Sequence, residues 1–100
     1  MKQYTTSDQT AKLIELGIEK PKSIEKMIPQ PVVDGYVHLV PQKAYSIGEL
    51  IEILNSVGEL EITRYGSGWG VYDELRAFTG EELIDALYDM MVKLKEEGVI

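Results

Sequence analysis

Hydrophobic residues recur three and four positions apart in three segments of the chain, which is the spacing of one face of an amphipathic helix. The segment after Tyr45 has the clearest start signal. Ser46 and Glu49 have the spacing of a capping box, and Tyr45 and Leu50 have that of a hydrophobic staple. A helix is therefore predicted from Ser46 to the region of Asn55, with one apolar stripe formed by Ile47, Leu50, Ile51 and Leu54.

The other two helical segments lie near the ends of the chain. A capping box at Thr6 and Gln9 predicts a helix of about ten residues. A similar box at Thr79 and Glu82 predicts a longer helix that ends at Gly98, where glycine suits a left-handed helix end.

Strict alternation of apolar and polar residues predicts a strand over Glu59–Tyr65. A loop at Gly66–Gly68 then allows Trp69–Tyr72 to return as the antiparallel partner. A further strand over Leu75–Phe78 would extend this hairpin into a small meander.

The middle of the chain gives a weaker signal. Asp34–Gly35 is typical of a turn, and Tyr36–Val40 is rich in strand-forming residues before Pro41, where the strand is expected to end. The segment Lys20–Pro31 contains three prolines and is interpreted as an irregular surface connection with at most one helical turn.

These elements predict a single α+β domain over residues 1–100. Its expected core is an antiparallel sheet of three to four short strands packed against two or three helices, in the order α-β-α-β-β-α. A chain of 100 residues with 44% hydrophobic residues buries enough surface to fold without disulfides or metals.

Composition narrows the functions that this domain can have. The absence of cysteine excludes disulfides, thiolate metal sites, iron–sulfur ligation and cysteine nucleophiles. The net charge is −7, with +1 on residues 1–45 and −8 on residues 46–100. The electric field of this negative charge repels phosphate groups, and the cluster of Lys20, Lys22 and Lys26 is too small to offset the repulsion. No nucleic-acid or membrane binding is therefore expected. No apolar signal segment occurs at the N-terminus, and a cytoplasmic location is predicted.

No catalytic, metal or cofactor site is predicted. His38 is the only histidine, so it has no partner for a metal cluster or a catalytic triad, and an exposed strand position is the simpler interpretation. Charged residues recur every four positions near the C-terminus, at Glu81, Asp85, Asp89, Lys93 and Glu97. This spacing suits a solvated helix face on which the carboxylates form favourable ion pairs with Lys93. The glycines at 66, 68 and 70 lack the remaining residues of a phosphate-binding loop.

Three aromatic residues around the glycine-rich turn form the candidate partner-binding site. Tyr65, Trp69 and Tyr72 place large rings within eight positions, and such rings often anchor protein partners. The alternative is structural: the same rings could cover the open sheet face or fill the core under the last helix.

The chain resembles small uncharacterised proteins of gut bacteria and their prophages or mobile elements. The resemblance rests on Ala11–Gly17, on Tyr45–Ile51 and on Ala86–Met91 ahead of Gly98, while Ser23–Lys43 departs from any such pattern. It implies a genomic context and carries no known activity.

Three functions are compatible with these observations. The leading hypothesis is a non-enzymatic accessory or protein-interaction domain with a protein partner, present as a monomer or weak homodimer. The first alternative is a small-ligand binder or unrecognised enzyme that uses the region of Tyr65, Trp69 and Tyr72. The second is an acidic mimic of nucleic acid, which would need its acidic residues in duplex-like rows.

Overall fold

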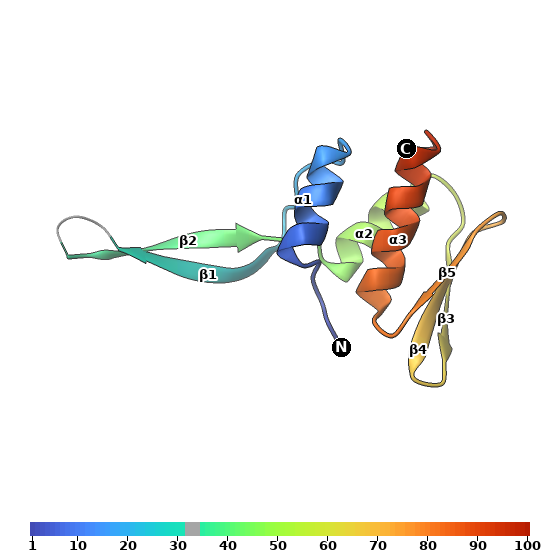
Figure 1. The fold of residues 1–100 in the computed structure, drawn as a ribbon, viewed down its shortest axis with the longest axis horizontal. Helices are drawn as coiled ribbons and strands as arrows, with labels where there is room; N and C mark the ends of the chain where they lie inside the picture. Colours follow the sequence, from blue (N-terminus) through green and yellow to red (C-terminus); the bar gives the residue numbers. More distant parts are fainter. Residues whose placement is uncertain (32–34) are drawn as a thin grey trace.

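The computed structural model describes residues 1–31 and 35–100, which form three helices and five strands (Figure 1). The α+β class is confirmed. The order is α-β-β-α-β-β-β-α, so the structure has two more strands than the predicted order contained. In chain order the elements are α1 (Ser7–Glu15), β1 (Ile24–Pro31), β2 (Val37–Lys43), α2 (Ile47–Asn55), β3 (Glu61–Tyr65), β4 (Gly68–Tyr72), β5 (Ala77–Gly80) and α3 (Leu83–Glu96).

Helix α3 organises the body of the molecule. It packs on β4 and β5 of the antiparallel sheet β3-β4-β5, and it also contacts α1 and α2. All seven of its apolar inward positions are buried, and together with residues from α1, α2 and β4 they form one core. The fully buried side chains of this core include Leu13, Tyr45, Leu50, Val71, Ile84, Leu87, Met90 and Met91.

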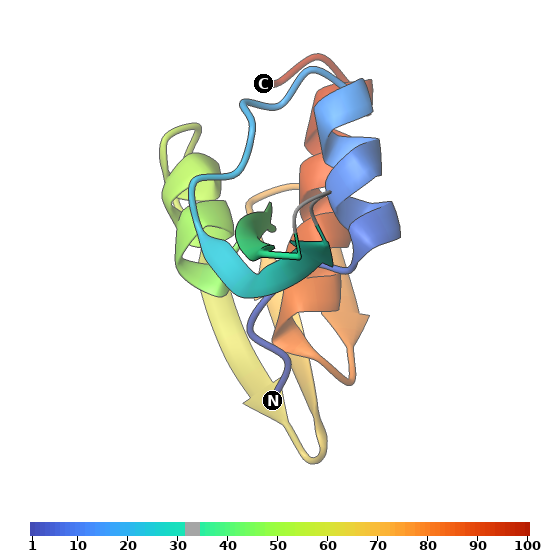
Figure 2. The same ribbon diagram turned by 90° about the vertical axis from the view of Figure 1, so that its left-hand side faces the viewer.

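Strands β1 and β2 form a separate two-stranded antiparallel sheet, which we call the arm. Figure 1 shows the arm projecting away from the helices, and Figure 2 views it end-on, with α2 on one side of it and α1 on the other. Apart from a hydrogen bond of 3.4 Å from Gln42 Nε2 of β2 to Ser7 Oγ of α1, neither strand packs against another described helix or strand. The described residues extend over 56 × 32 × 18 Å. The five strands therefore form two sheets, where a single sheet was expected.

The arm corrects two predictions. Lys20–Pro31 was expected to be irregular, yet Ile24–Pro31 is a strand, and the second strand continues past Pro41 to Lys43. Of the predicted Asp34–Gly35 turn, Gly35 has a left-handed φ of +84°, while Asp34 lies outside the described residues.

Register explains why the prolines do not break these strands. Pro29 pairs with Leu39, Pro31 with Val37, and Pro41 with Met27. These three pairs alternate with the other pairs along the arm, as the non-hydrogen-bonded pairs of an antiparallel sheet do. In such pairs the backbone N–H and C=O groups point away from the partner strand, so a proline, which has no N–H, is tolerated there. The three prolines thus cost no bond between β1 and β2, and they remove donors from the outer edges of the arm.

Two of the three helices begin at the capping boxes predicted for them. Both halves of the capping box are present at α1, with Thr6 and Gln9, and at α2. The box predicted at Thr79 and Glu82 is wrong: Thr79 pairs with Gly70 inside β5, and α3 begins later, with Glu82 as an N-cap that makes no side-chain cap bond. Strand pairing keeps Thr79 extended and carries the chain past the predicted helix start.

Candidate functional site

The sheet divides the three aromatic residues predicted to form one site. Across β3 and β4, Tyr65 pairs with Gly68 and Glu61 with Tyr72, whereas Arg64 pairs with Trp69. Because side chains alternate between the faces of a strand, Tyr65 and Tyr72 share the outer face, and Trp69 lies on the inner face with the core.

The two tyrosines pack against each other over a glycine. Their ring centroids are 6.3 Å apart with an edge-on interplanar angle of 78°. A Cβ atom at Gly70 would lie 2.4 Å from Tyr72 Oη and 2.7 Å from Tyr65 Cε2, so only glycine leaves room for this arrangement. Tyr72 Oη is buried there, and no hydrogen-bond partner is found for it among the described residues.

Trp69 is partly buried on the inner face. Its ring packs against the core, and the Arg64 guanidinium carbon lies 5.1 Å from the ring centroid in a cation–π contact. Trp69 therefore does not join Tyr65 and Tyr72 in one continuous surface.

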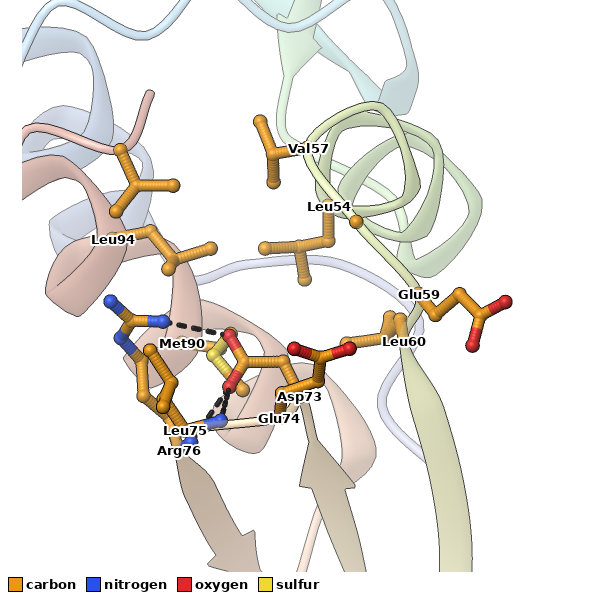
Figure 3. Close-up of a pocket in the computed structure, with 12 residues that line it drawn as sticks. Leu54, Val57, Glu59, Leu60, Asp73, Glu74, Leu75, Arg76, Met90 and Leu94 are labelled. Atoms are coloured by element: carbon orange, nitrogen blue, oxygen red, sulfur yellow. Dashed lines mark hydrogen bonds and ion pairs between the residues drawn. The ribbon is translucent and has the colours of Figure 1, made fainter.

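A surface cavity of about 330 Å³ lies at the end of the body where α2, α3 and the β4–β5 turn meet (Figure 3). Leu54, Met90 and Leu94 contribute an apolar floor, and Figure 3 shows these side chains directed toward the same space. Its rim is exposed. The rim residues include Val57, Glu59, Glu74, Leu75 and Val99, and Leu75 is 82% exposed.

Ionic contacts hold one wall of this cavity in place. Asp73 accepts hydrogen bonds from the backbone N–H groups of Leu75 and Arg76, at 2.8 and 2.7 Å, and from Arg76 Nη1 at 2.9 Å. The same guanidinium also donates to the carboxylate of Glu97, the C-cap residue of α3. Burial alone would raise the pKa of Asp73, but these donors hold it below its ordinary value. The β4–β5 turn is thus fixed to the end of α3, with Leu75 at its tip.

The arm carries a second apolar surface. Six residues share one of its faces and all are exposed; this apolar arm face consists of Met27, Pro29, Pro31, Val37, Leu39 and Pro41. Val37 and Leu39 are 62% and 61% exposed. Continuing the alternation along the two strands places Lys43 of β2 and Glu25 of β1 at the body-proximal end of the same face. The opposite face is mostly polar and contains Lys26, Ile28, Gln30, His38, Val40 and Gln42.

Glu49 fastens the base of the arm to α2. Its carboxylate accepts backbone N–H bonds from Lys22 at 2.9 Å, Ser23 at 3.1 Å and Ser46 at 3.2 Å. Burial alone would raise the pKa of Glu49, but these donors lower it below its ordinary value. The capping box of α2 therefore also fixes the chain that leads into β1.

Tyr45 completes this junction. Its hydroxyl donates to the Glu19 carbonyl oxygen at 2.5 Å, and its backbone N–H donates to Thr5 Oγ1 at 3.1 Å. Burial, together with the charges of Glu49 and Glu19, raises the pKa of Tyr45 to about 12.

The remaining candidates have structural surroundings. His38 is exposed on the polar face of the arm, opposite Gln30. Asp85 accepts hydrogen bonds from Gln9 Nε2 at 2.9 Å and Lys2 Nζ at 3.4 Å, which joins α3 to the N-terminal segment. In residues 1–31 and 35–100, no three His, Asp or Glu side chains are grouped so that they could hold a metal ion.

No protein-family model, curated protein or solved structure matches this chain. Within the part of the chain that the structure describes, none of the helices combines the length and hydrophobicity needed to cross a membrane.

Proposed function

We propose that this chain is a non-enzymatic protein-interaction domain that docks on a protein partner through the apolar arm face. One observation carries the proposal: six apolar or proline side chains lie exposed on a two-stranded arm that no other described element covers. A two-stranded sheet alone in water is marginally stable at best, so burial of this face against a partner would stabilise the arm itself.

Charge supports a protein as the partner. Residues 27–42 contain no Lys or Arg. Phosphate backbones and anionic headgroups are bound chiefly by such cations, and the net charge of −7 repels both.

The prolines support contact through the face of the arm rather than its edge. A partner strand added to β1 would need outward N–H donors, and Pro29 and Pro31 have none. Pro41 interrupts the outer edge of β2 in the same way. Side chains on the apolar arm face are therefore the groups that remain available for docking.

Site-specific photocrosslinking tests the proposal in the cells that produce the protein. A photoreactive phenylalanine derivative is placed at Leu39, on the apolar arm face, and separately at Gln30, on the polar face. We expect a discrete protein adduct from position 39 and none, or far less, from position 30. Both positions are exposed on the arm, so they differ in face and not in accessibility.

Two results would overturn the proposal. One is equal adduct formation from both faces, which indicates random collision. The other is the absence of any protein adduct from position 39 although the protein is folded and expressed.

A further inference from the structure

Strand β3 is an open edge of the three-stranded sheet. In the order β3-β4-β5 it has a strand on one side only, and α3 lies over β4 and β5. Among the described helices and strands, β4 is the only backbone neighbour of β3. Four of its five residues are exposed: Glu61, Thr63, Arg64 and Tyr65. A further strand can therefore approach β3 without displacing any described element.

The hydrogen-bond pattern of the sheet leaves two residues of β3 facing outward. The Asp73 N–H donates to the Arg76 carbonyl oxygen at 3.0 Å, so alternate residues from Trp69 to Asp73 direct their backbone groups toward β5. Ile62 and Arg64 lie opposite two of these residues. Their N–H and C=O groups consequently point away from β4, and no hydrogen bond to another described element is found for them.

The edges of the arm are blocked against strand pairing, whereas the edge of β3 is not. Prolines remove outward N–H donors from both edges of the arm, as the register of β1 and β2 shows. Strand β3 contains no proline. Outward N–H and C=O groups at every second residue are complementary to an extended backbone, so the binding partner of this edge is another strand.

We infer that β3 pairs antiparallel with β3 of a second copy, which joins two three-stranded sheets into one sheet of six strands. When residues 61–65 of the two copies overlap completely, Ile62 lies opposite Arg64, so outward groups meet outward groups. Thr63 then lies opposite Thr63 on the twofold axis, and Glu61 lies opposite Tyr65. Any shift of this register shortens the overlap, and one such shift places Arg64 opposite itself.

The residues of β3 favour a second copy as the added strand. The strand has one acidic and one basic residue, and in full overlap neither charge faces its like. Each Tyr65, which is 49% exposed, gains Glu61 of the other copy as a hydrogen-bond acceptor beside it. The contact is isologous, so it closes at a dimer and leaves both arms free. The inference does not rest on the docking function of the arm.

Sedimentation of the full chain tests the dimer. The weight-average mass should rise with concentration toward twice 11.3 kDa and not beyond it. The range should reach about 1 mM, so that a contact with a Kd of that order is detected. Arg64→Pro removes an outward N–H without removing a bond to β4, and it should be monomeric. Arg64→Ala also removes the side chain but keeps the N–H, so it should dimerise as the wild type does.

Disulfide crosslinking tests the register and does not require the proline variant to fold. The chain has no cysteine, so Thr63→Cys introduces a single thiol at the twofold axis. Opposed residues of a non-hydrogen-bonded pair have Cα atoms about 4.5 Å apart, which a disulfide can span. We expect mild oxidation to convert this variant to a covalent dimer. Glu61→Cys, exposed on the same face of β3, is the matched control and should crosslink far more slowly, because it faces Tyr65.

Several results would overturn the inference. They are a wild type that stays monomeric throughout the range, a dimer that Arg64→Pro leaves intact, and equal crosslinking of Thr63→Cys and Glu61→Cys, which indicates random collision. Leu39→Glu, on the apolar arm face, should dimerise as the wild type does, and loss of its dimer would assign the contact to the arm. A monomeric wild type with a position-39 adduct to a different protein would leave the docking function of the arm standing.

Discussion

Glu49→Gln tests the junction between the arm and α2. Glu49 receives three backbone N–H bonds, two from the chain leading into β1 and one from its own helix start. Glutamine keeps one acceptor oxygen and directs an NH₂ group toward donors. Each hydrogen bond to a charged group contributes about 1.5–3 kcal/mol, and each bond between neutral groups about 0.5–1.5 kcal/mol. Because Glu49 is partly exposed to solvent, we expect the variant to lose about 2 kcal/mol of unfolding free energy. That loss lowers the Tm of a domain of this size by roughly 8–16 °C.

The pH dependence gives this prediction its sign. The pKa of Glu49 is lowered in the folded protein, so its stabilisation is present above the ordinary value of 4.5 and is lost as the pH falls through the folded value. Urea denaturation followed by circular dichroism should therefore show a large difference between wild type and variant at neutral pH, and a smaller one well below pH 4.5.

Glu52→Gln, an exposed position on the same helix, is the control and should change stability by less than about 0.5 kcal/mol. An unchanged stability of Glu49→Gln at neutral pH would refute the argument. So would a difference from wild type that does not shrink on acidification.

Three further predictions test other parts of the body. In an alkaline absorbance titration one of the six tyrosines should ionise at about pH 12, and Tyr45→Phe should remove that step. The stabilisation that Tyr45 provides should be lost as the pH rises from 10 toward 12. Titration of every tyrosine near pH 10 would contradict the prediction. Gly68→Ala should destabilise the protein by about 1–3 kcal/mol, and by more than Gly70→Ala does. The Cβ of an alanine at position 68 would lie 2.9 Å from a fixed backbone carbonyl oxygen of β5, whereas the tyrosine rings above Gly70 can turn toward solvent. A greater loss of stability for Gly70→Ala than for Gly68→Ala in urea denaturation would contradict this prediction. Arg64→Ala should increase acrylamide quenching of Trp69 fluorescence by uncovering the ring, and an unchanged quenching constant would show that the cation–π contact does not shield it.

Local chemistry made the helices α1 and α2 predictable. A capping box depends on residues three positions apart, and the two boxes that start these helices formed as expected. The box predicted at Thr79 failed because a distant interaction, the pairing of β5 with β4, competes for the same residue. Sequence patterns of a few residues do not contain that competitor.

The strand predicted over Tyr36–Val40 is present as most of β2, but β1 and the continuation of β2 past Pro41 escaped prediction for a related reason. A proline breaks a strand only where its missing N–H would have faced a partner strand, and this depends on the register of β1 with β2. The signal that was present is the period-two spacing of Met27, Pro29 and Pro31. It became meaningful only opposite Val37, Leu39 and Pro41, which continue the same face.

The division of the aromatic residues was within reach of the sequence. A three-residue loop was predicted at Gly66–Gly68, whereas the structure has a two-residue turn with Gly68 already in β4. With the two-residue turn, pairing Tyr65 with Gly68 places Tyr72 on the same face as Tyr65 and Trp69 on the other. Trp69 and Tyr72 are three positions apart in β4, so they lie on opposite faces in any register, and the register decides only which of the two Tyr65 joins.

The isolation of the arm separates the demands that folding and binding make on the sequence. The arm contributes nothing to the core under α3, so its residues carry little of the free energy that keeps the body folded. Amide hydrogens along β1 and β2 should then exchange with solvent much faster than those of α3. Substitutions on the arm can accordingly accumulate and retarget the protein without crossing the threshold for unfolding, so this element is the part of the chain freest to evolve with whatever it contacts.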